Sequence, residues 1–82
     1  MEVLRSAFRH GILTEDIHHA VRYSLVLEQI GEDPVRYLVL GPACSGRLLE
    51  LVVLDRPQGP AVIHAMGMRP KYQRLLPKGG SR

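Results

Sequence analysis

The sequence predicts an α+β fold in which two N-terminal helices pack on a small antiparallel three-stranded sheet, with a short C-terminal helix. Three observations lead to this fold class. Apolar residues recur with helical spacing in the first third of the chain, and after that they form strand-like runs between turn residues. The 82 residues suit one domain and are too few for two. We therefore expect a single domain over residues 1–76 and a flexible basic tail over residues 77–82.

Both N-terminal helices are expected from apolar residues spaced three or four apart. The first covers residues 3–8, and Gly11 allows the left-handed turn that ends it. The second begins near Thr14, a suitable N-cap, and ends between Val26 and Ile30. Its stripe has a period near 3.6 and consists of Ile17, Ala20, Val21, Ser24 and Leu25.

Three strands and a final helix are expected from the rest of the chain. The strands cover residues 35–40, 47–55 and 60–68, each bounded by glycine and proline. Residues 56–59 fit a type I turn whose glycine takes a positive φ, so the last two strands form a hairpin. A proline in the first position predicts a short helix over residues 70–76.

The turn sets the register of this hairpin and therefore its two faces. Opposed pairs are Val52 with His64, Glu50 with Met66, and Arg47 with Arg69. One face is wholly apolar and is expected to receive the helices; it contains Leu49, Leu51, Val53, Ala61, Ile63 and Ala65. The other face is expected to stay open; it contains Leu48, Glu50, Val52, Leu54, Val62, His64, Met66 and Met68.

The open face leads directly into a group of side chains that could act on RNA. Metal-independent RNA cleavage uses a base for the 2′-hydroxyl, cations for the phosphorane and an acid for the leaving oxygen. The candidate catalytic residues are His64, Glu50, Arg69 and Tyr72, and the candidate RNA-binding residues are Arg47, Lys71 and Arg74. We expect Glu50 to orient His64, and the opposed pair Arg47 and Arg69 to hold a phosphate between them.

A purely structural interpretation of these residues is open as well. In that interpretation His64 is a half-buried histidine bound to Glu50, Tyr72 anchors the last helix on the sheet, and Arg69 only ends a strand. Spacing alone favours this second interpretation.

Charge is distributed unevenly along the chain, whose net charge is +3. The first 56 residues hold six basic and all eight acidic residues, whereas the rest holds five basic residues and no acid. Such a basic end suits a phosphate-containing or acidic partner. A solvated tail that aids solubility is the alternative.

Other kinds of site are excluded by what the sequence lacks. There is no glycine-rich phosphate loop, and the single Cys44 rules out an intramolecular disulfide and has no evident base beside it. His18 and His19 would point about 100° apart on a helix, which is poor geometry for one metal. We therefore expect no metal and no cofactor. The longest aliphatic run, residues 51–54, is far too short for a membrane helix, and we expect a cytoplasmic protein.

Two stretches resemble a known family. Residues 8–12 (Phe-Arg-His-Gly-Ile), with Glu15, Asp16 and Ala20 downstream, resemble the opening of BrnT-type toxins. The strand over residues 62–69 is similar to the strand that ends their sheet, and also to the end of small actinobacterial proteins labelled as toxins. BrnT-type toxins belong to the RelE/ParE-like group of small bacterial toxins. The resemblance implies two helices against an antiparallel sheet, an RNA-cleaving activity and a DNA-binding antitoxin encoded nearby.

The resemblance transfers few site residues. Only Arg69 matches the strand-end arginine of the family, and His64 stands where the family has an arginine in the last strand. The assignments of Glu50, Lys71 and Tyr72 come from the expected hairpin geometry instead.

Taken with the basic end, these features predict the toxin of a type II toxin–antitoxin system, an endoribonuclease that cleaves mRNA, free or on the ribosome. The alternatives are a non-catalytic binding module of the same fold and a gyrase-directed toxin. A homodimer and a hetero-oligomer with the antitoxin both remain open. We expect an antitoxin segment to cover the open face at Val52, Leu54, Val62, Met66 and Met68, and to meet Arg69 and Lys71 with acidic side chains.

Overall fold

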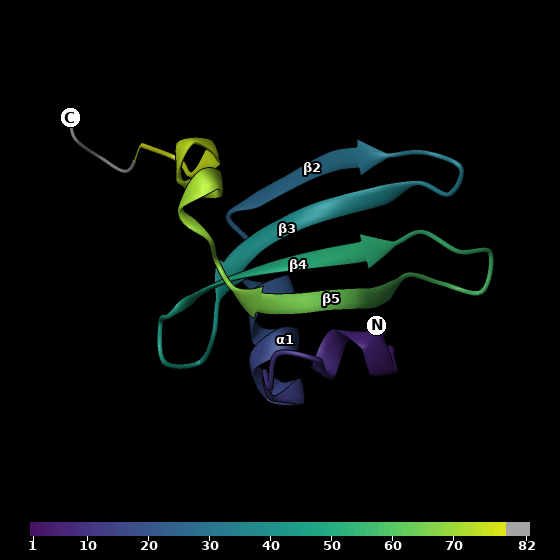
Figure 1. The fold of residues 1–82 in the computed structure, drawn as a ribbon, viewed down its shortest axis with the longest axis horizontal. Coiled ribbons are helices and arrows are strands. Elements are labelled where there is room, and N and C mark those ends of the chain that lie inside the picture. The colour runs from purple at the N-terminus through teal and green to yellow at the C-terminus, as the bar shows by residue number, and fades with distance from the viewer. Residues whose placement is uncertain (79–82) are drawn as a thin grey trace.

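A single mixed sheet forms the centre of the molecule (Figure 1). The computed structural model describes residues 1–78. The sheet has five strands in the order β1-β5-β4-β3-β2, and only the β1–β5 pair is parallel. The strands are β1 (Glu2–Val3), β2 (Val26–Gly31), β3 (Arg36–Pro42), β4 (Leu48–Leu54) and β5 (Ala61–Gly67).

One α-helix covers one face of this sheet. The helix α1 (Thr14–Arg22) packs mainly on β3 and also contacts β4. Residues 1–78 also contain two 3₁₀ helices. The first, η1 (Arg5–Phe8), packs on β5, and the second, η2 (Pro70–Leu75), follows β5. In Figure 1 the chain turns back after β5, so that η2 lies beside the sheet on the side away from α1.

The expectation of two N-terminal helices on a three-stranded sheet is wrong. Where the first helix was expected, Val3 pairs with Val62 as part of β1, and only the four residues of η1 are helical. Such a short segment cannot offset the cost of nucleating an α-helix. Its backbone is instead stabilised by the free edge of β5, where Leu4 N donates to Val62 O at 2.9 Å.

The expected end of the second helix is also wrong. The helix ends at Arg22, and Val26–Gly31 forms the edge strand β2, which is paired with β3. Leu25 N donates to Leu40 O at 2.7 Å, so strand pairing begins three residues after the end of the helix. The helical spacing of apolar residues continues to Leu25, but pairing with β3 satisfies the backbone there and overrides the local pattern.

The remaining strands and the final turn confirm the expectations for this part of the chain. β3, β4 and β5 begin and end within two residues of the expected bounds. In the turn, Gly59 has φ +117° and its N donates to Arg56 O at 3.0 Å. The expected pairs Val52 with His64 and Glu50 with Met66 are both present. The final helix is a 3₁₀ helix with Pro70 first, and residues 79–82 of the expected tail lie outside the described part of the chain.

A bulge in β5 changes the faces of two predicted residues, Val62 and Ala61. Beyond Val52 the register shifts, so Val53 pairs with Val62 and Ile63 is the extra residue. Val62 therefore joins the core under α1 and does not lie on the open face as expected. Ala61 pairs with Leu54 and so lies on the face opposite α1, not on the helix face as expected. The carbonyl of Ile63 accepts a hydrogen bond from Ser6 Oγ at 2.7 Å, which attaches η1 to β5.

The core lies between α1 and the sheet. Its buried residues are Ala7, Ile12, Ile17, Ala20, Val39, Ala43, Leu49, Leu51, Val53, Val62 and Ala65. The helix approaches β3 most closely at Gly41, where a β-carbon would overlap the carbonyl of Ala20. This glycine is required by the spacing between helix and sheet.

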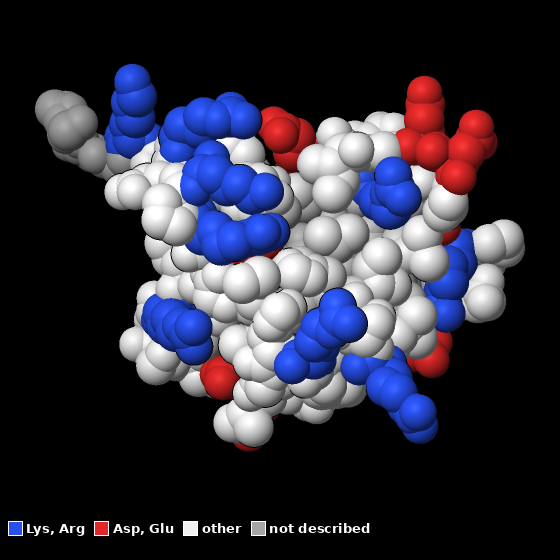
Figure 2. All heavy atoms as spheres, in the orientation of Figure 1, with Lys and Arg blue, Asp and Glu red and all other residues white. Residues whose placement is uncertain are grey.

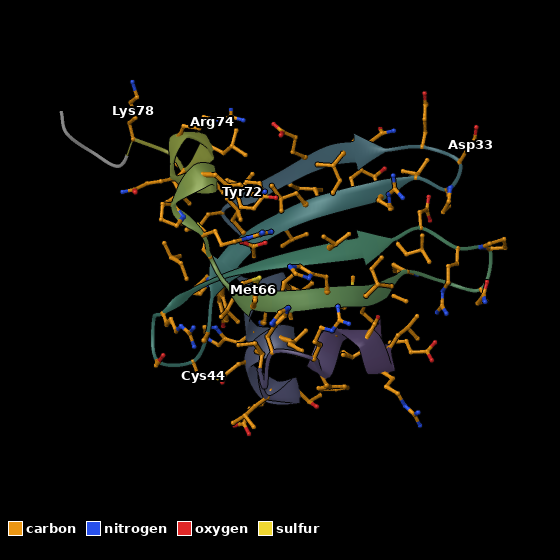
Figure 3. The ribbon with its side chains drawn as sticks, in the orientation of Figure 1. Asp33, Cys44, Met66, Tyr72, Arg74 and Lys78 are labelled. Atoms are coloured by element: carbon orange, nitrogen blue, oxygen red, sulfur yellow. The ribbon has the colours of Figure 1, made fainter. Side chains whose placement is uncertain are left out.

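The opposite face of the sheet is not the open surface that the sequence suggested. Leu38 and Leu40 on β3 are almost fully buried there, as is Glu50 on β4. Tyr72 of η2 is half-buried and lies between this helix and the sheet (Figure 3). The C-terminal segment of the chain itself therefore covers part of this face.

Candidate functional site

The buried carboxylate of Glu50 is the centre of the candidate site. Its side chain is 1% exposed and accepts four hydrogen bonds. Arg69 provides three of these bonds: Nε (3.0 Å) and the backbone N (2.9 Å) donate to Oε1, and Nη2 (2.7 Å) donates to Oε2. His64 Nε2 donates to Oε2 at 3.1 Å. With these acceptor sites occupied, Glu50 can orient its partners but cannot itself reach a substrate.

These contacts decide the charge of Glu50. Burial alone would raise the pKa of this carboxyl. The hydrogen bonds from the Arg69 side chain and backbone and from His64 outweigh burial, so the pKa of Glu50 lies below its usual value. In turn, the hydrogen bond to Glu50 raises the pKa of Arg69. The site therefore contains a carboxylate and a guanidinium at neutral pH.

His64 is held in one orientation by this carboxylate. When the ring is neutral, the Nε2 proton points at Glu50 and Nδ1 carries a free lone pair. The side chain is 28% exposed, so the ring remains accessible. A carboxylate that fixes the tautomer of a neighbouring imidazole is the arrangement that prepares histidine to act as a base.

A cluster of cations lies next to this carboxylate and imidazole. Tyr72 is in contact with two of them, with Lys71 Nζ 5.0 Å and Arg69 Cζ 5.8 Å from the ring centroid. Figure 2 shows basic side chains gathered over η2, and Figure 3 places Arg74 and Lys78 there. We call this group the basic surface, and it consists of Arg69, Lys71, Arg74 and Lys78, all exposed. Such a surface can attract phosphates.

Arg47 does not belong to the basic surface. Its guanidinium lies where a β-carbon of Gly67 would stand. Gly67 pairs with Leu49, which points to α1, so Arg47 lies on the helix side, whereas Arg69 binds Glu50 on the other side. Side chains alternate across a strand, and the turn of Arg69 toward Glu50 breaks the expected opposition. The two arginines therefore do not hold one phosphate between them.

His10 is a member of the site that the sequence analysis did not select. Its ring meets the His64 ring edge-on, with centroids 5.6 Å apart and an interplanar angle of 77°. Two signals mark it in the sequence: it follows the first expected helix, where a basic residue suits the helix end, and it lies in the stretch 8–12 that resembles the toxin family. Neither signal assigned it a role in the site. Contact with His64 depends on the docking of η1 on β5, which local patterns do not reveal.

The two remaining histidines, which lie in α1, and the cysteine have no evident chemical role. His18 is exposed, and His19 Nδ1 donates to Pro42 O at 2.7 Å, which ties α1 to the end of β3. Cys44 is exposed, and a hydrogen bond with Asp16 raises the pKa of its thiol, which disfavours the nucleophilic thiolate. Within residues 1–78, no group of three or more metal-ligating side chains could hold an ion.

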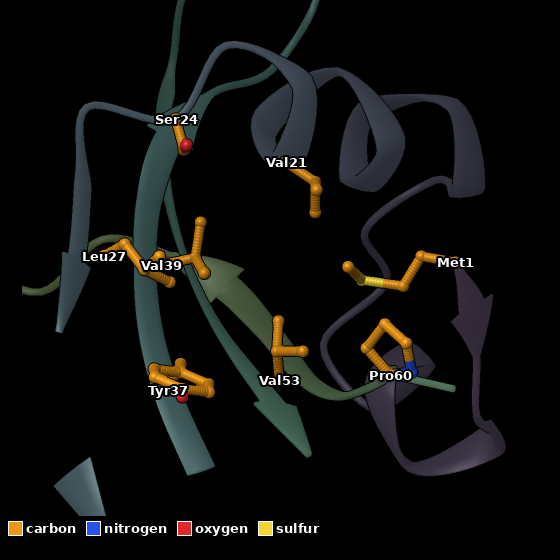
Figure 4. Close-up of a pocket in the computed structure, with 8 residues that line it drawn as sticks. All are labelled: Met1, Val21, Ser24, Leu27, Tyr37, Val39, Val53 and Pro60. Atoms are coloured by element: carbon orange, nitrogen blue, oxygen red, sulfur yellow. The ribbon is translucent and has the colours of Figure 1, made fainter. Parts of the chain in front are cut away.

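A cavity of about 310 Å³ lies on the helix side of the sheet (Figure 4). Its lining is apolar apart from the hydroxyls of Ser24 and Tyr37. The lining residues are Met1, Val21, Ser24, Leu27, Tyr37, Val39, Val53 and Pro60. Because these groups include no carboxylate, imidazole or side-chain cation, we place the candidate chemistry around Glu50.

No family model, curated protein or solved structure matches the chain. None of the helices in the described residues is both long and apolar enough to cross a membrane.

Proposed function

We propose that this chain is the toxin of a type II toxin–antitoxin system, related to the BrnT-type toxins, that cleaves RNA without a metal in the cytoplasm. The observation that carries the proposal is the imidazole of His64, oriented by the buried Glu50 and placed next to the basic surface. A base beside fixed cations is what cleavage at a 2′-hydroxyl requires. The toxin resemblance of residues 8–12 and 62–69 supports the same activity.

In the proposed reaction, the 2′-hydroxyl of the ribose is the nucleophile. His64 Nδ1 accepts the proton of the 2′-hydroxyl, and the 2′-oxygen forms a bond to the adjacent phosphorus. The bond from phosphorus to the 5′-oxygen breaks, and this oxygen takes up a proton. The products are a 2′,3′-cyclic phosphate and a 5′-hydroxyl, with no water consumed. Lys71 and the exposed part of Arg69 stabilise the charge that develops on the phosphoryl oxygens.

The partner in this proposal is an antitoxin with an acidic segment. Lys71, Arg74 and Lys78 are exposed and form no ion pair within the described residues, so they can meet carboxylates. Met66 and Met68 are half-buried beside the site and provide apolar contact area. An antitoxin that covers this surface would exclude RNA from His64. Such an interface also allows a hetero-oligomer to form.

The test is cleavage by the purified chain. A 5′-labelled mRNA leader, offered free in EDTA and on ribosomes in a separate Mg²⁺-containing sample, is expected to give fragments with 2′,3′-cyclic phosphate ends. His64→Ala should lower the rate by about 10²–10⁴-fold. His18→Ala is the matched control, because it removes an exposed histidine of α1 and should cut like the wild type. Intact RNA in all wild-type samples, together with normal growth of cells expressing the chain alone, would refute the enzyme.

A non-catalytic binding module is the second candidate, and one observation favours it. Arg69 uses two guanidinium nitrogens and its backbone N on Glu50, so it has fewer donors left for a phosphate. In this alternative, Glu50 is mainly a structural anchor of η2. RNA binding that weakens steeply with salt, with no cleavage by the wild type, would select the binding module.

A further inference from the structure

We propose that His10 is the second proton-transfer group of this site, the general acid that protonates the leaving 5′-oxygen. The inference rests on the proposed RNA cleavage. His10 lies in the stretch that resembles the opening of the toxin family, but the resemblance assigned it no role, and the hairpin geometry did not include it.

The position of His10 is enforced by contacts on both sides of η1. Before it, Leu4 N donates to Val62 O at 2.9 Å and Ser6 Oγ donates to Ile63 O at 2.7 Å, and these carbonyls belong to the two residues that precede His64. After it, Gly11 has φ +77° and its N donates to Phe8 O at 3.1 Å. The short segment that carries His10 is therefore fastened to the edge of β5, and its ring reaches His64.

The two imidazoles differ in what surrounds them. His64 donates Nε2–H to Glu50, which leaves Nδ1 to accept a proton. The exposed His10 takes part in no side-chain hydrogen bond or ion pair with the described residues, so both its nitrogens are available to a substrate. The carboxylate-bound ring suits the base, and the free ring, in its protonated form, suits the acid.

A second proton-transfer group is needed because of the geometry of phosphoryl transfer. The attacking and leaving oxygens lie on opposite sides of phosphorus, so one ring cannot serve both at the same moment. Tyr72 is the other side chain that could donate, but its ring is in contact with the cations of Lys71 and Arg69. The His10 and His64 centroids, by contrast, are 5.6 Å apart, and both rings reach solvent.

Each proton is accounted for in this scheme. His64 takes the proton of the 2′-hydroxyl as the new bond to phosphorus forms. His10 gives a proton to the 5′-oxygen as its bond to phosphorus breaks. The enzyme ends with His64 protonated and His10 neutral, and proton exchange with water restores both groups.

The experiment compares two substrates that differ only in their need for an acid. One is an RNA oligonucleotide whose leaving group is a 5′-alkoxide. The other is the set of four nucleoside 3′-(4-nitrophenyl phosphates), whose leaving phenolate departs without protonation. The full chain and its His10→Ala, His64→Ala and Tyr72→Phe variants are assayed on both, with His18→Ala as the matched histidine control. Circular dichroism melts verify that each variant is folded.

We expect His10→Ala to cut the oligonucleotide about 10²–10⁴-fold more slowly, yet to lose less than about 10-fold on the nitrophenyl esters. His64→Ala should lose activity on both substrates. The assignment is overturned if folded His10→Ala keeps its activity on the oligonucleotide, or loses both activities equally. It is also overturned if Tyr72→Phe alone shows the selective loss. A wild type that cuts neither substrate refutes the proposed function itself, and with it this inference.

Discussion

Replacing the buried carboxylate by its neutral isostere, Glu50→Gln, should destabilise the fold measurably. The change keeps the size of the side chain but turns an amide NH₂ toward Arg69 and His64, which are both donors. A lost hydrogen bond to a charged group costs about 1.5–3 kcal/mol. Because the Arg69 side chain is 45% exposed and can regain water, we expect the lower part of this range, about 2 kcal/mol. For a domain of this size, that corresponds to a melting temperature lower by about 8–16 °C.

The stability lost in Glu50→Gln should depend on pH, because it comes from the charge of the Glu50 carboxylate. The pKa of Glu50 is lower in the folded chain than its ordinary value of 4.5. Its stabilising contribution is therefore complete above that value and is lost as the pH falls through the folded pKa. The free-energy difference between wild type and Glu50→Gln should be largest at neutral pH and should shrink toward zero in acid.

Urea unfolding followed by circular dichroism at a series of pH values measures both effects. The matched control is Glu28→Gln, since Glu28 lies on the same face of the sheet, paired with Leu38, but is exposed. This control should change the free energy of unfolding by less than about 0.5 kcal/mol. The reasoning fails if Glu50→Gln is as stable as the control at neutral pH, or if its deficit does not depend on pH.

Three further predictions concern other parts of the chain. Gly41→Ala should lower the free energy of unfolding in urea by about 1–3 kcal/mol, because the new methyl group meets the backbone of α1. Gly67→Ala should cost less, because its methyl group meets the flexible end of an arginine side chain. Equal losses in the two variants would contradict this packing argument. Asp16→Asn should speed alkylation of Cys44 by iodoacetamide at mildly alkaline pH, since the hydrogen bond with Asp16 raises the pKa of the thiol; an unchanged rate would show that the bond does not control reactivity. Lys71→Gln should weaken RNA binding and reduce the slope of log affinity against log salt by about 1; an unchanged slope would place RNA elsewhere.

The hairpin and the adjacency of Glu50 and His64 were predictable because they depend on neighbouring residues. The turn at residues 56–59 fixes which residues oppose each other, and alternation along a strand then assigns the faces. That reasoning holds up to Val52. It fails beyond the bulge, where Ile63 O accepts a hydrogen bond from Ser6, which is 57 residues away in the chain.

The edges of the sheet could not be predicted in this way. The residues of β2 carry an apolar pattern that fits a helix as well as a strand, and only the free edge of β3 makes the strand favourable. The same holds for β1, whose two residues are a strand only because β5 offers unpaired backbone groups.

The sequence by itself determined the central hairpin, the basic end and the pairing of a carboxylate with an imidazole, because these follow from turn chemistry, strand alternation and charge. The tertiary structure decided that Arg69 turns away from Arg47 to bind Glu50, and that His10 comes to lie against His64. The physical reason is the same in both cases. A buried carboxylate needs donors, and an open sheet edge needs partners, and each takes them from whichever distant segment the fold brings within reach.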